Sequence, residues 1–209
     1  PKIVVLSAMS QTTNVLHQIC DSIGTSQFEE AKDTLAMLLE RYRGVVKDLY
    51  NSPQYHKKAT AFIEERFDFI SSYIHEAAVT VLSETEKIIV AQGEILSTNL
   101  FSLYLEEASV AASYLSAFDF MRIDEAGEPD SDYLTSALGA ILDANPQTEL
   151  YITQGYICLN PEGDIDNLKR GGSDYSASLI GAAIQAEEIQ IWTDIDGMHN
   201  NDPRYVDNT

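Results

Sequence analysis

The spacing of hydrophobic positions changes along the chain, and each spacing predicts a different kind of element. Residues 3–6 form an unbroken apolar run, which is typical of a buried strand. From about 26 to 107 the apolar positions recur every three or four residues, which is the period of an amphipathic helix. After 110, short apolar runs alternate with further helical stretches. This succession favours an α/β fold with a long helical insertion.

The helical region predicts three long helices, over 26–50, 54–81 and 83–107. The first two are separated by Asn51-Ser52-Pro53, a short turn that indicates a helical hairpin. The remaining elements that we expect are strands at 3–7, 110–115, 150–153 and 189–193, and helices at 131–143 and 174–187. Strands that alternate with helices predict a mostly parallel central sheet covered on both faces, a three-layer αβα sandwich.

The charge of the chain limits its partners. Among 209 residues, 33 are acidic and 13 are Lys or Arg, giving a formal charge of −20. Such a field repels nucleic acids and anionic membrane surfaces, which excludes both as general partners. It also repels small anions, so an anionic ligand needs local cations or a metal ion. No run of about 18 apolar residues suggests a membrane span.

The cysteines and histidines offer no metal-binding pattern. Cys20 and Cys158 lie far apart among apolar neighbours, which predicts buried free thiols in a reducing, cytoplasmic compartment. The four histidines are scattered and do not predict a zinc site.

The segment from Arg170 to Asp174 carries the strongest local signal. Gly171 and Gly172 permit a sharp turn and a close approach of the backbone to a ligand, and Ser173 is suited to cap the helix that follows. Free N–H groups at a helix start attract anions, and Arg170 adds a planar fork of donors. The alternative is an ordinary loop-to-helix turn with a surface arginine.

Other polar groups fall at the predicted ends of strands. Ser7 and Thr13 follow the first strand, Gln154-Gly155-Tyr156 follow another, and Thr193-Asp194 close the last. The carboxyl ends of parallel strands form the binding edge of such a sheet. Glu94 lies beside a mid-helix glycine and could bind a ligand ammonium group, or it could be a solvated helix residue.

Four segments together resemble the amino acid kinase superfamily, and within it aspartate kinase. They occur in the order of that family and cover almost the whole chain. The matching segments are 5–14, with Ser7-Ala8-Met9 and Thr13-Asn14; Gln92–Ser97; Gln154–Ile157 followed by Arg170–Tyr175; and Ile191–Gly197 followed by Asp202–Arg204.

The resemblance implies transfer of the γ-phosphoryl group of ATP, with Mg²⁺, to the side-chain carboxylate of L-aspartate. The product would be 4-phospho-L-aspartate, at the first step of lysine, threonine and methionine biosynthesis. By the same resemblance, Arg170 holds the α-carboxylate of aspartate and Glu94 its α-ammonium group. Thr13 and the backbone of Gly171–Ser173 line the same pocket.

The resemblance also assigns the phosphoryl and nucleotide contacts. Asp174 orients groups at the transferring phosphoryl, and Ser7 lies near it. The nucleotide contacts fall on Thr193, Asp194, His199 and Arg204. His199 either stacks on the nucleotide or is an exposed loop histidine. The parent protein is expected to be a homo-oligomer.

The chain departs from the family pattern in several places. No K-F-G-G-T-S segment is present, and Asp166-Asn167 stand where the family often has Thr-Thr. We therefore expect 1–209 to be a catalytic domain without its first strand, its C-terminal part or a regulatory domain, and to be inactive or nearly so as written. The alternatives are another superfamily member, acting on glutamate or acetylglutamate, and a non-catalytic interaction fragment.

Overall fold

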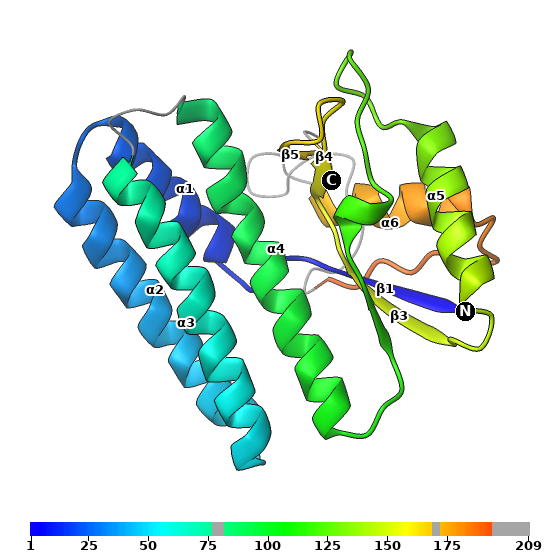
Figure 1. Ribbon diagram of the computed structural model, residues 1–209, viewed down its shortest axis with the longest axis horizontal. Helices are drawn as coiled ribbons and strands as arrows, with labels where there is room; N and C mark the ends of the chain where they lie inside the picture. The colour runs from blue at the N-terminus through cyan, green and yellow to red at the C-terminus, as the bar shows by residue number, and fades with distance from the viewer. Residues whose placement is uncertain (77–81, 169–171, 194–209) are drawn as a thin grey trace, which may run out of the picture.

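The computed structural model describes residues 1–76, 82–168 and 172–193, and places a parallel sheet between two layers of helices (Figure 1). The described strands of this sheet are β1 (Lys2–Leu6), β2 (Ser113–Leu115) and β3 (Leu150–Gln154), in the order β1-β3-β2. Helix α4 (Leu82–Glu107) lies on one side, and α5 (Ser131–Ala144) and α6 (Gly172–Ala183) lie on the other. The predicted three-layer αβα fold is confirmed.

The register of the sheet places the carboxyl ends of β1 and β3 side by side. Val4 of β1 and Tyr114 of β2 both pair with Ile152 of β3, and both pairings are parallel. Leu6 is opposite Gln154, so β1 and β3 end at the same edge of the sheet. Any side chains that follow these two strands are therefore close neighbours.

The long insertion is a four-helix bundle that shares α4 with the sandwich. Its other members are α1 (Thr12–Gly24), α2 (Phe28–Leu49) and α3 (Pro53–Glu76). Each helix packs against the next, and α1 also packs against α4, which closes the bundle (Figure 1). The predicted helices over 26–50 and 83–107 and the helical hairpin are thus confirmed. The helix expected to reach 81 is described as far as Glu76.

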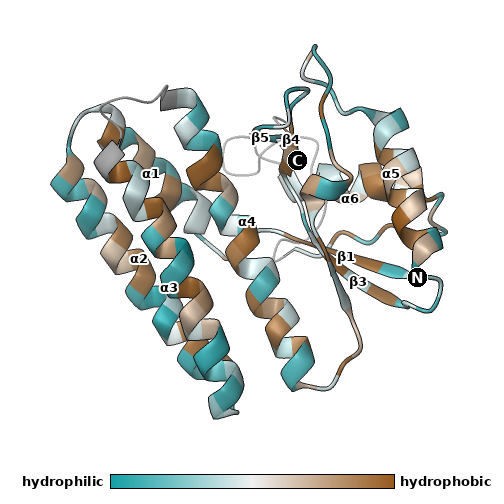
Figure 2. Cartoon of the chain, viewed as in Figure 1, coloured by the Kyte–Doolittle hydropathy of each residue, from teal (hydrophilic) through white to brown (hydrophobic). Residues whose placement is uncertain are grey.

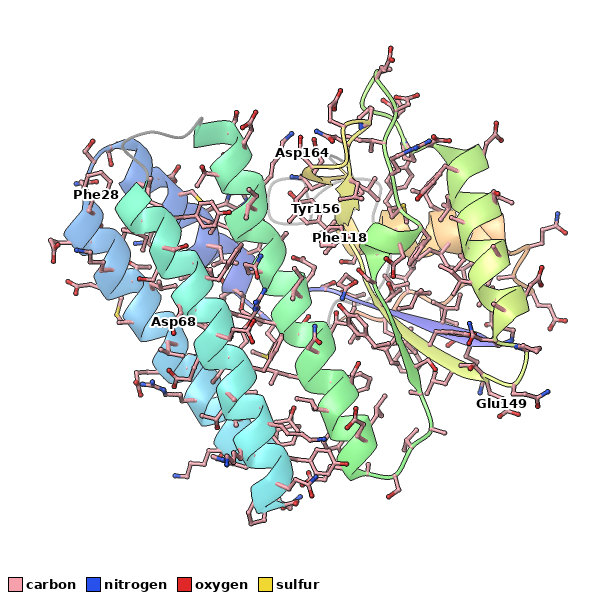
Figure 3. The ribbon with its side chains drawn as sticks, in the orientation of Figure 1. Phe28, Asp68, Phe118, Glu149, Tyr156 and Asp164 are labelled. Carbon is pink, nitrogen blue, oxygen red and sulfur yellow. The ribbon has the colours of Figure 1, made fainter. Side chains whose placement is uncertain are left out.

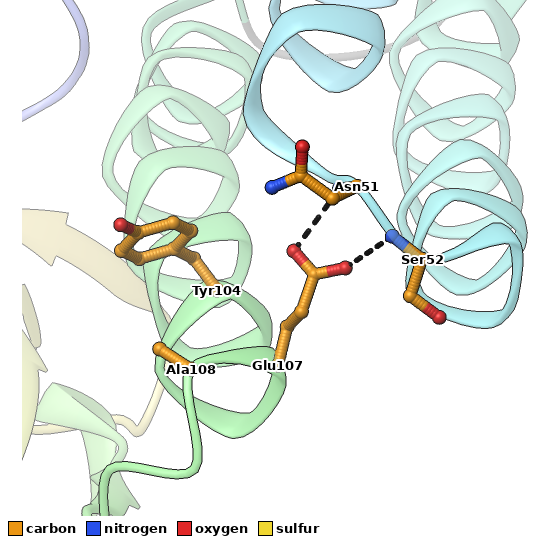
Figure 4. A pocket seen from close by; sticks show the side chains of 5 residues that line it. All are labelled: Asn51, Ser52, Tyr104, Glu107 and Ala108. Carbon is orange, nitrogen blue, oxygen red and sulfur yellow. Dashed lines mark hydrogen bonds between the residues drawn. The ribbon is translucent and has the colours of Figure 1, made fainter.

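The turn between α2 and α3 is tied to the far end of α4. Pro53 starts α3, where its missing N–H group costs no hydrogen bond. The carboxylate of Glu107 accepts hydrogen bonds from the backbone N–H groups of Asn51, at 3.2 Å, and Ser52 (Figure 4). These residues, with Tyr104 and Ala108, line an open surface pocket. The Glu107 carboxylate therefore holds two bundle elements in register.

Two hydrophobic clusters hold the fold together, and α4 contributes to both. The first, the bundle cluster, fills the interior of the four helices and includes Ile89 and Leu96 of α4. The second, the sheet cluster, lies around the sheet, α5 and α6, and includes Ala91 of α4. Figure 2 shows the apolar faces of the helices turned toward one another and their polar faces turned outward. Helix α4 thus joins the two halves of the molecule.

Helix α4 is apolar enough that its sequence alone also fits a membrane-spanning helix. By length and composition alone, residues 83–107 could cross a membrane, contrary to our expectation that no such stretch is present. However, 56% of the most apolar window is buried inside the structure. A core helix that packs on two sides passes the same test, and α4 has this place in the fold.

The structure corrects several predicted elements. The strand expected at 110–115 is shorter, because only Ser113–Leu115 pair with β3. The helix expected at 174–187 runs from Gly172 to Ala183. The loop expected between 158 and 172 contains an antiparallel hairpin of β4 (Ile157–Leu159) and β5 (Ile165–Asn167).

The strand expected at 189–193 is wrong. These residues have no regular secondary structure in the described chain, and none of them pairs with a described strand. Ile191 is 42% exposed and Trp192 is 88% exposed, while the Ile189 side chain packs beside Gly181 of α6. An apolar run forms a strand only where a neighbouring strand takes up its hydrogen bonds, and the described residues supply none here.

The bundle cluster makes one stability prediction. Ile70 of α3 is fully buried, so Ile70→Ala should lower the free energy of unfolding by about 2–5 kcal/mol through lost burial and a cavity. Met37 of α2 is 67% exposed, so Met37→Ala should change it by less than about 0.5 kcal/mol. Urea unfolding followed by circular dichroism checks both values. Equal effects of the two substitutions would contradict the described packing of α3.

Candidate functional site

The end of β1 is fastened to the middle of α4. The backbone N–H of Ala8 donates a hydrogen bond to Oε1 of Glu94 at 3.3 Å. One residue earlier, the Ser7 carbonyl accepts a hydrogen bond from the Ser97 hydroxyl at 2.6 Å. The two contacts lie about one helical turn apart on α4. They place Ser7 and Ala8, at the end of β1, directly beside the Glu94 carboxylate.

Gly93 permits this close approach. A Cβ atom at this position would lie 2.9 Å from the Cβ of Ala8 and 3.4 Å from a methyl group of Leu16. The first distance is shorter than real Cβ contacts, so a larger residue would push α4 away from the turn that follows β1. The mid-helix glycine, which costs about 1 kcal/mol relative to Ala, therefore has a packing function.

Glu94 is a buried carboxylate with an incomplete set of partners. The residue is 4% exposed, and its Oε2 atom has no hydrogen-bond partner. Burial raises the pKa of Glu94 to about 7, although the N–H of Ala8 and the helix backbone favour the charged form. Buried polar atoms in proteins are nearly always paired, so an unpaired carboxylate oxygen points to a ligand with a donor group. The alternative reading of Glu94 as a solvated helix residue is wrong.

The end of β3 is packed against the beginning of α6. The N–H of Gly155 donates to the carbonyl of Leu6 at 2.9 Å, which joins the ends of β1 and β3. A Cβ atom on Gly155 would lie 2.4 Å from both the Cβ and the hydroxyl of Ser173, and 2.7 Å from its Cα. Only glycine therefore lets the first turn of α6 approach this strand end.

Tyr156 continues this contact in a strained backbone conformation. Its φ angle is 66°, which is uncommon for a residue other than glycine. Its N–H donates to the Ser176 hydroxyl of α6 at 2.7 Å. The side chain lies between the two clusters and packs against both (Figure 3). Burial raises the pKa of its hydroxyl, and the nearby charge of Glu94 adds to this shift.

The described part of the predicted site therefore converges on one edge of the sheet. Ser7 lies at the end of β1, Glu94 faces it from α4, and Ser173 lies beside the end of β3. Gly172 begins α6 with a positive φ of 51°, as its place in a sharp turn requires. Thr13 is half-buried in the first turn of α1.

Other predicted residues are not brought into this group. Asp174 is exposed in the first turn of α6, and Thr193 is exposed in the irregular segment that follows the helix. The remaining predicted residues lie outside the described residues; they are Arg170, Gly171, Asp194, His199 and Arg204.

Sequence reasoning placed Gln154 and Tyr156 at this edge without giving them a role, and it missed Ser176. Gln154 accepts a hydrogen bond from the Ala117 N–H at 2.9 Å and donates to the Tyr114 hydroxyl, which fixes the end of β3. Tyr156 and Ser176 form the backbone contact described above. One signal was present, because Ser176 lies three residues after Ser173 and thus on the same face of α6.

Neither a metal cluster nor the pocket of Figure 4 competes with this edge as a site. Among the described residues, no group of three His, Cys, Asp or Glu side chains could hold a metal ion. Cys20 and Cys158 are free and buried, as predicted, and burial raises the pKa of each thiol to about 12. The pocket beside Glu107 lies 13 residues along α4 from Glu94, which corresponds to about 20 Å.

Comparisons with known proteins bear on the family and the fold of the chain. The chain is 32% identical to lysine-sensitive aspartokinase 3 of Escherichia coli over 98% of its own length and 45% of that protein. The crystal structure of E. coli aspartokinase III in complex with lysine and aspartate superimposes with a TM-score of 0.74, covering 98% of this chain and 45% of that one, at 30% identity.

A second crystal structure of the same E. coli enzyme, in complex with aspartate and ADP, gives a TM-score of 0.72 at 30% identity, over 97% of this chain and 44% of that one. The chain thus spans a little less than half the length of these relatives. The sequence pattern of the amino acid kinase family matches residues 1–209. The chain belongs to the amino acid kinase family.

Proposed function

We propose that this chain binds L-aspartate and forms part of the catalytic domain of an aspartate kinase. The enzyme would transfer the γ-phosphoryl group of ATP to the side-chain carboxylate and yield 4-phospho-L-aspartate, the first step of lysine, threonine and methionine biosynthesis. The observation that carries the proposal is the buried, half-paired carboxylate of Glu94 at the shared end of β1 and β3. The similarity to aspartokinases over nearly the whole chain supports the choice of aspartate.

Glu94 would bind the α-ammonium group of the amino acid. An ammonium group carries three donors, so one of them satisfies the unpaired Oε2 atom. The same positive charge favours the ionised carboxylate, which burial otherwise disfavours. The pairing therefore lowers the pKa of Glu94 and strengthens binding at once.

The turn at the start of α6 would bind the α-carboxylate. Its first backbone N–H groups lack partners within the helix and attract an anion. Arg170 immediately precedes this turn in sequence and would provide the paired donors. Thr13 and the backbone of Gly171–Ser173 would complete the pocket. In this arrangement the two α-substituents are fixed, which leaves the side-chain carboxylate of aspartate free to attack.

Ser7 and Asp174 would act at the transferred phosphoryl group, which ATP supplies when bound. Positioning and neutralisation of charge dominate phosphoryl transfer, so hydroxyl and backbone donors at the end of β1 suit this step. The nucleotide itself would contact Thr193, Asp194, His199 and Arg204. Mg²⁺ would be held mainly by the nucleotide phosphates, as is usual for this ion in phosphoryl-transfer sites. We place the protein in the cytoplasm, as a homo-oligomer.

Removal of the Glu94 charge should weaken aspartate binding. Glu94→Gln replaces a charged acceptor by a neutral amide of the same shape, and a hydrogen bond to a charged group contributes about 1.5–3 kcal/mol, so Kd should rise about 10- to 100-fold. Isothermal titration of L-aspartate into the chain measures this change. Glu84→Gln, at an exposed position in the first turn of α4, is the matched control and should leave Kd unchanged.

Arg170→Ala should weaken L-aspartate binding to a similar degree, with L-glutamate as the control ligand. Selective aspartate binding that survives both Glu94→Gln and Arg170→Ala would contradict the proposed pocket. So would an absence of binding by the unsubstituted chain when circular dichroism shows that it is folded.

The pKa of Glu94 predicts how binding depends on pH. Only the ionised carboxylate pairs with the ammonium group, and the pKa of free Glu94 is raised to about 7. Affinity for L-aspartate should therefore be highest above that pH and fall as the pH decreases from about 8 to about 6, approaching tenfold per pH unit at the lower end. The same titrations at several pH values test this. In Glu94→Gln the dependence over this interval should disappear, and an unchanged profile would assign it to another group.

The contact between Gly155 and Ser173 predicts a geometric effect. In Gly155→Ala the new methyl group would meet Ser173 and displace the start of α6. Binding of L-aspartate should weaken by about tenfold or more, which corresponds to about 1.4 kcal/mol of lost contact energy. Gly139→Ala in α5, where a Cβ meets nothing within 4 Å, is the control and should retain full affinity. Equal affinities of the two variants would show that the approach of α6 to β3 does not shape the pocket.

A further inference from the structure

Lys87 of α4 forms an ion pair with Asp166 of β5 that the proposed chemistry does not use. The Nζ atom of Lys87 donates to Oδ2 of Asp166. The Asp166 side chain is only 7% exposed, and its other oxygen accepts the N–H of Asn167 at 2.8 Å. The Lys87 side chain is 34% exposed. A nearly buried carboxylate is thus neutralised by one cation that reaches it from another element.

The two residues lie at informative places on their elements. Lys87 precedes Glu94 by seven residues, about two turns, so both project from the same face of α4. Asp166 is directly opposite Cys158 in the β4–β5 hairpin. The ion pair therefore connects this hairpin to the face of the helix that carries the proposed ammonium-binding carboxylate.

The hairpin in turn leads into the start of α6. Leu168 follows β5, is 2% exposed in the sheet cluster, and donates its N–H to the Tyr156 carbonyl at 2.8 Å. Only three residues then separate it from Gly172, where α6 begins. Tyr156 in turn donates its N–H to the Ser176 hydroxyl of α6, so a displacement of β5 would reach α6 through these two hydrogen bonds.

The surroundings of the site are negatively charged. Tyr156 lies near Glu94, Glu86 and Asp166, whose negative charges all raise the pKa of its hydroxyl after the larger effect of burial. An amino-acid dicarboxylate has to enter this acidic surrounding. Neutralisation of Asp166 by Lys87 removes one of these repulsive charges, and Lys87 itself lies about 10 Å from Glu94 along α4, a separation given by the helical rise.

We propose that Lys87 and Asp166 are positioning residues, and that their ion pair holds the β4–β5 hairpin, and with it the start of α6, in register with Glu94 for amino-acid binding. This inference rests on the proposed function. Neither residue touches the substrate. The pair acts by setting the separation between α4, which would bind the α-ammonium group, and the start of α6, which would bind the α-carboxylate group.

The test combines a local structural readout with a binding readout. Lys87→Met removes the cation and leaves Asp166 uncompensated, whereas Lys87→Met with Asp166→Asn removes both charges. Alkylation by N-ethylmaleimide, followed by peptide mass spectrometry, reports opening at Cys158, which pairs with Asp166 across the hairpin. Cys20, which lies in the bundle cluster, is the internal control for global unfolding. Titration with L-aspartate gives the Kd of each variant.

In Lys87→Met, alkylation of Cys158 should accelerate by about tenfold or more while that of Cys20 stays unchanged, because removing one partner of a largely buried ion pair is strongly destabilising at that place. The Kd for L-aspartate should rise by a similar factor. In the double variant, the alkylation rate of Cys158 and the Kd should both return most of the way to the values of the unsubstituted chain. Lys58→Met, which breaks an exposed ion pair with Glu106 at the far end of the bundle, should alter neither readout.

Several results would overturn the inference. Unchanged alkylation of Cys158 in Lys87→Met would show that the pair does not hold the hairpin. Faster alkylation with an unchanged Kd would show that the hairpin does not position the amino-acid site. Equal acceleration at Cys20 and Cys158 would indicate a general loss of stability. Failure of the unsubstituted, folded chain to bind L-aspartate would instead contradict the proposed function, and the positioning role would fall with it.

Discussion

The structure depends on one helix that is buried from two sides. Helix α4 supplies apolar residues to the bundle cluster and to the sheet cluster, so neither half of the molecule has a complete core without it. Glu94 is placed in this same helix, where solvent is excluded. The energetic cost of an ionisable group at such a place is offset in part by the N–H of Ala8 and by the helix backbone, and the proposed ligand ammonium group would offset more of it, which would couple core packing to recognition.

Two glycines allow the helices to pack closely enough on the strand ends to form the proposed site. Gly93 lets α4 contact the turn after β1, and Gly155 lets α6 contact the end of β3. At both positions an added methyl group would meet a neighbouring residue at less than the normal contact distance. The groups that would bind the two ends of an amino acid are therefore separated by backbone approach distances, which are stiffer than side-chain conformations.

The sequence predicted the helices and the strand ends well because their signals are local. The three-to-four-residue spacing of 26–107 predicted three of the four bundle helices, and the shared edge of Ser7 and Gln154 followed from the parallel order of strands. The place of Glu94 and Ser173 at that edge was implied by the resemblance to aspartate kinase. The prediction for segment 189–193 was wrong because its apolar pattern is typical of a strand, whereas strand pairing depends on a partner that is distant in sequence. The β4–β5 hairpin, the strained Tyr156 and the Lys87–Asp166 pair could not be predicted, since each depends on which elements tertiary packing brings together.

The pairing of β1 with β3 has a consequence for the order of folding. Lys2 is opposite Leu150, so this pairing joins two segments that have all four bundle helices between them in sequence, whereas most contacts of the bundle link consecutive helices. Local contacts form at lower entropic cost than distant ones. During synthesis on the ribosome, α1 to α4 are complete before β3 exists. The bundle is thus expected to assemble first, and the Ala8–Glu94 contact to become fixed only once β3 has paired with β1.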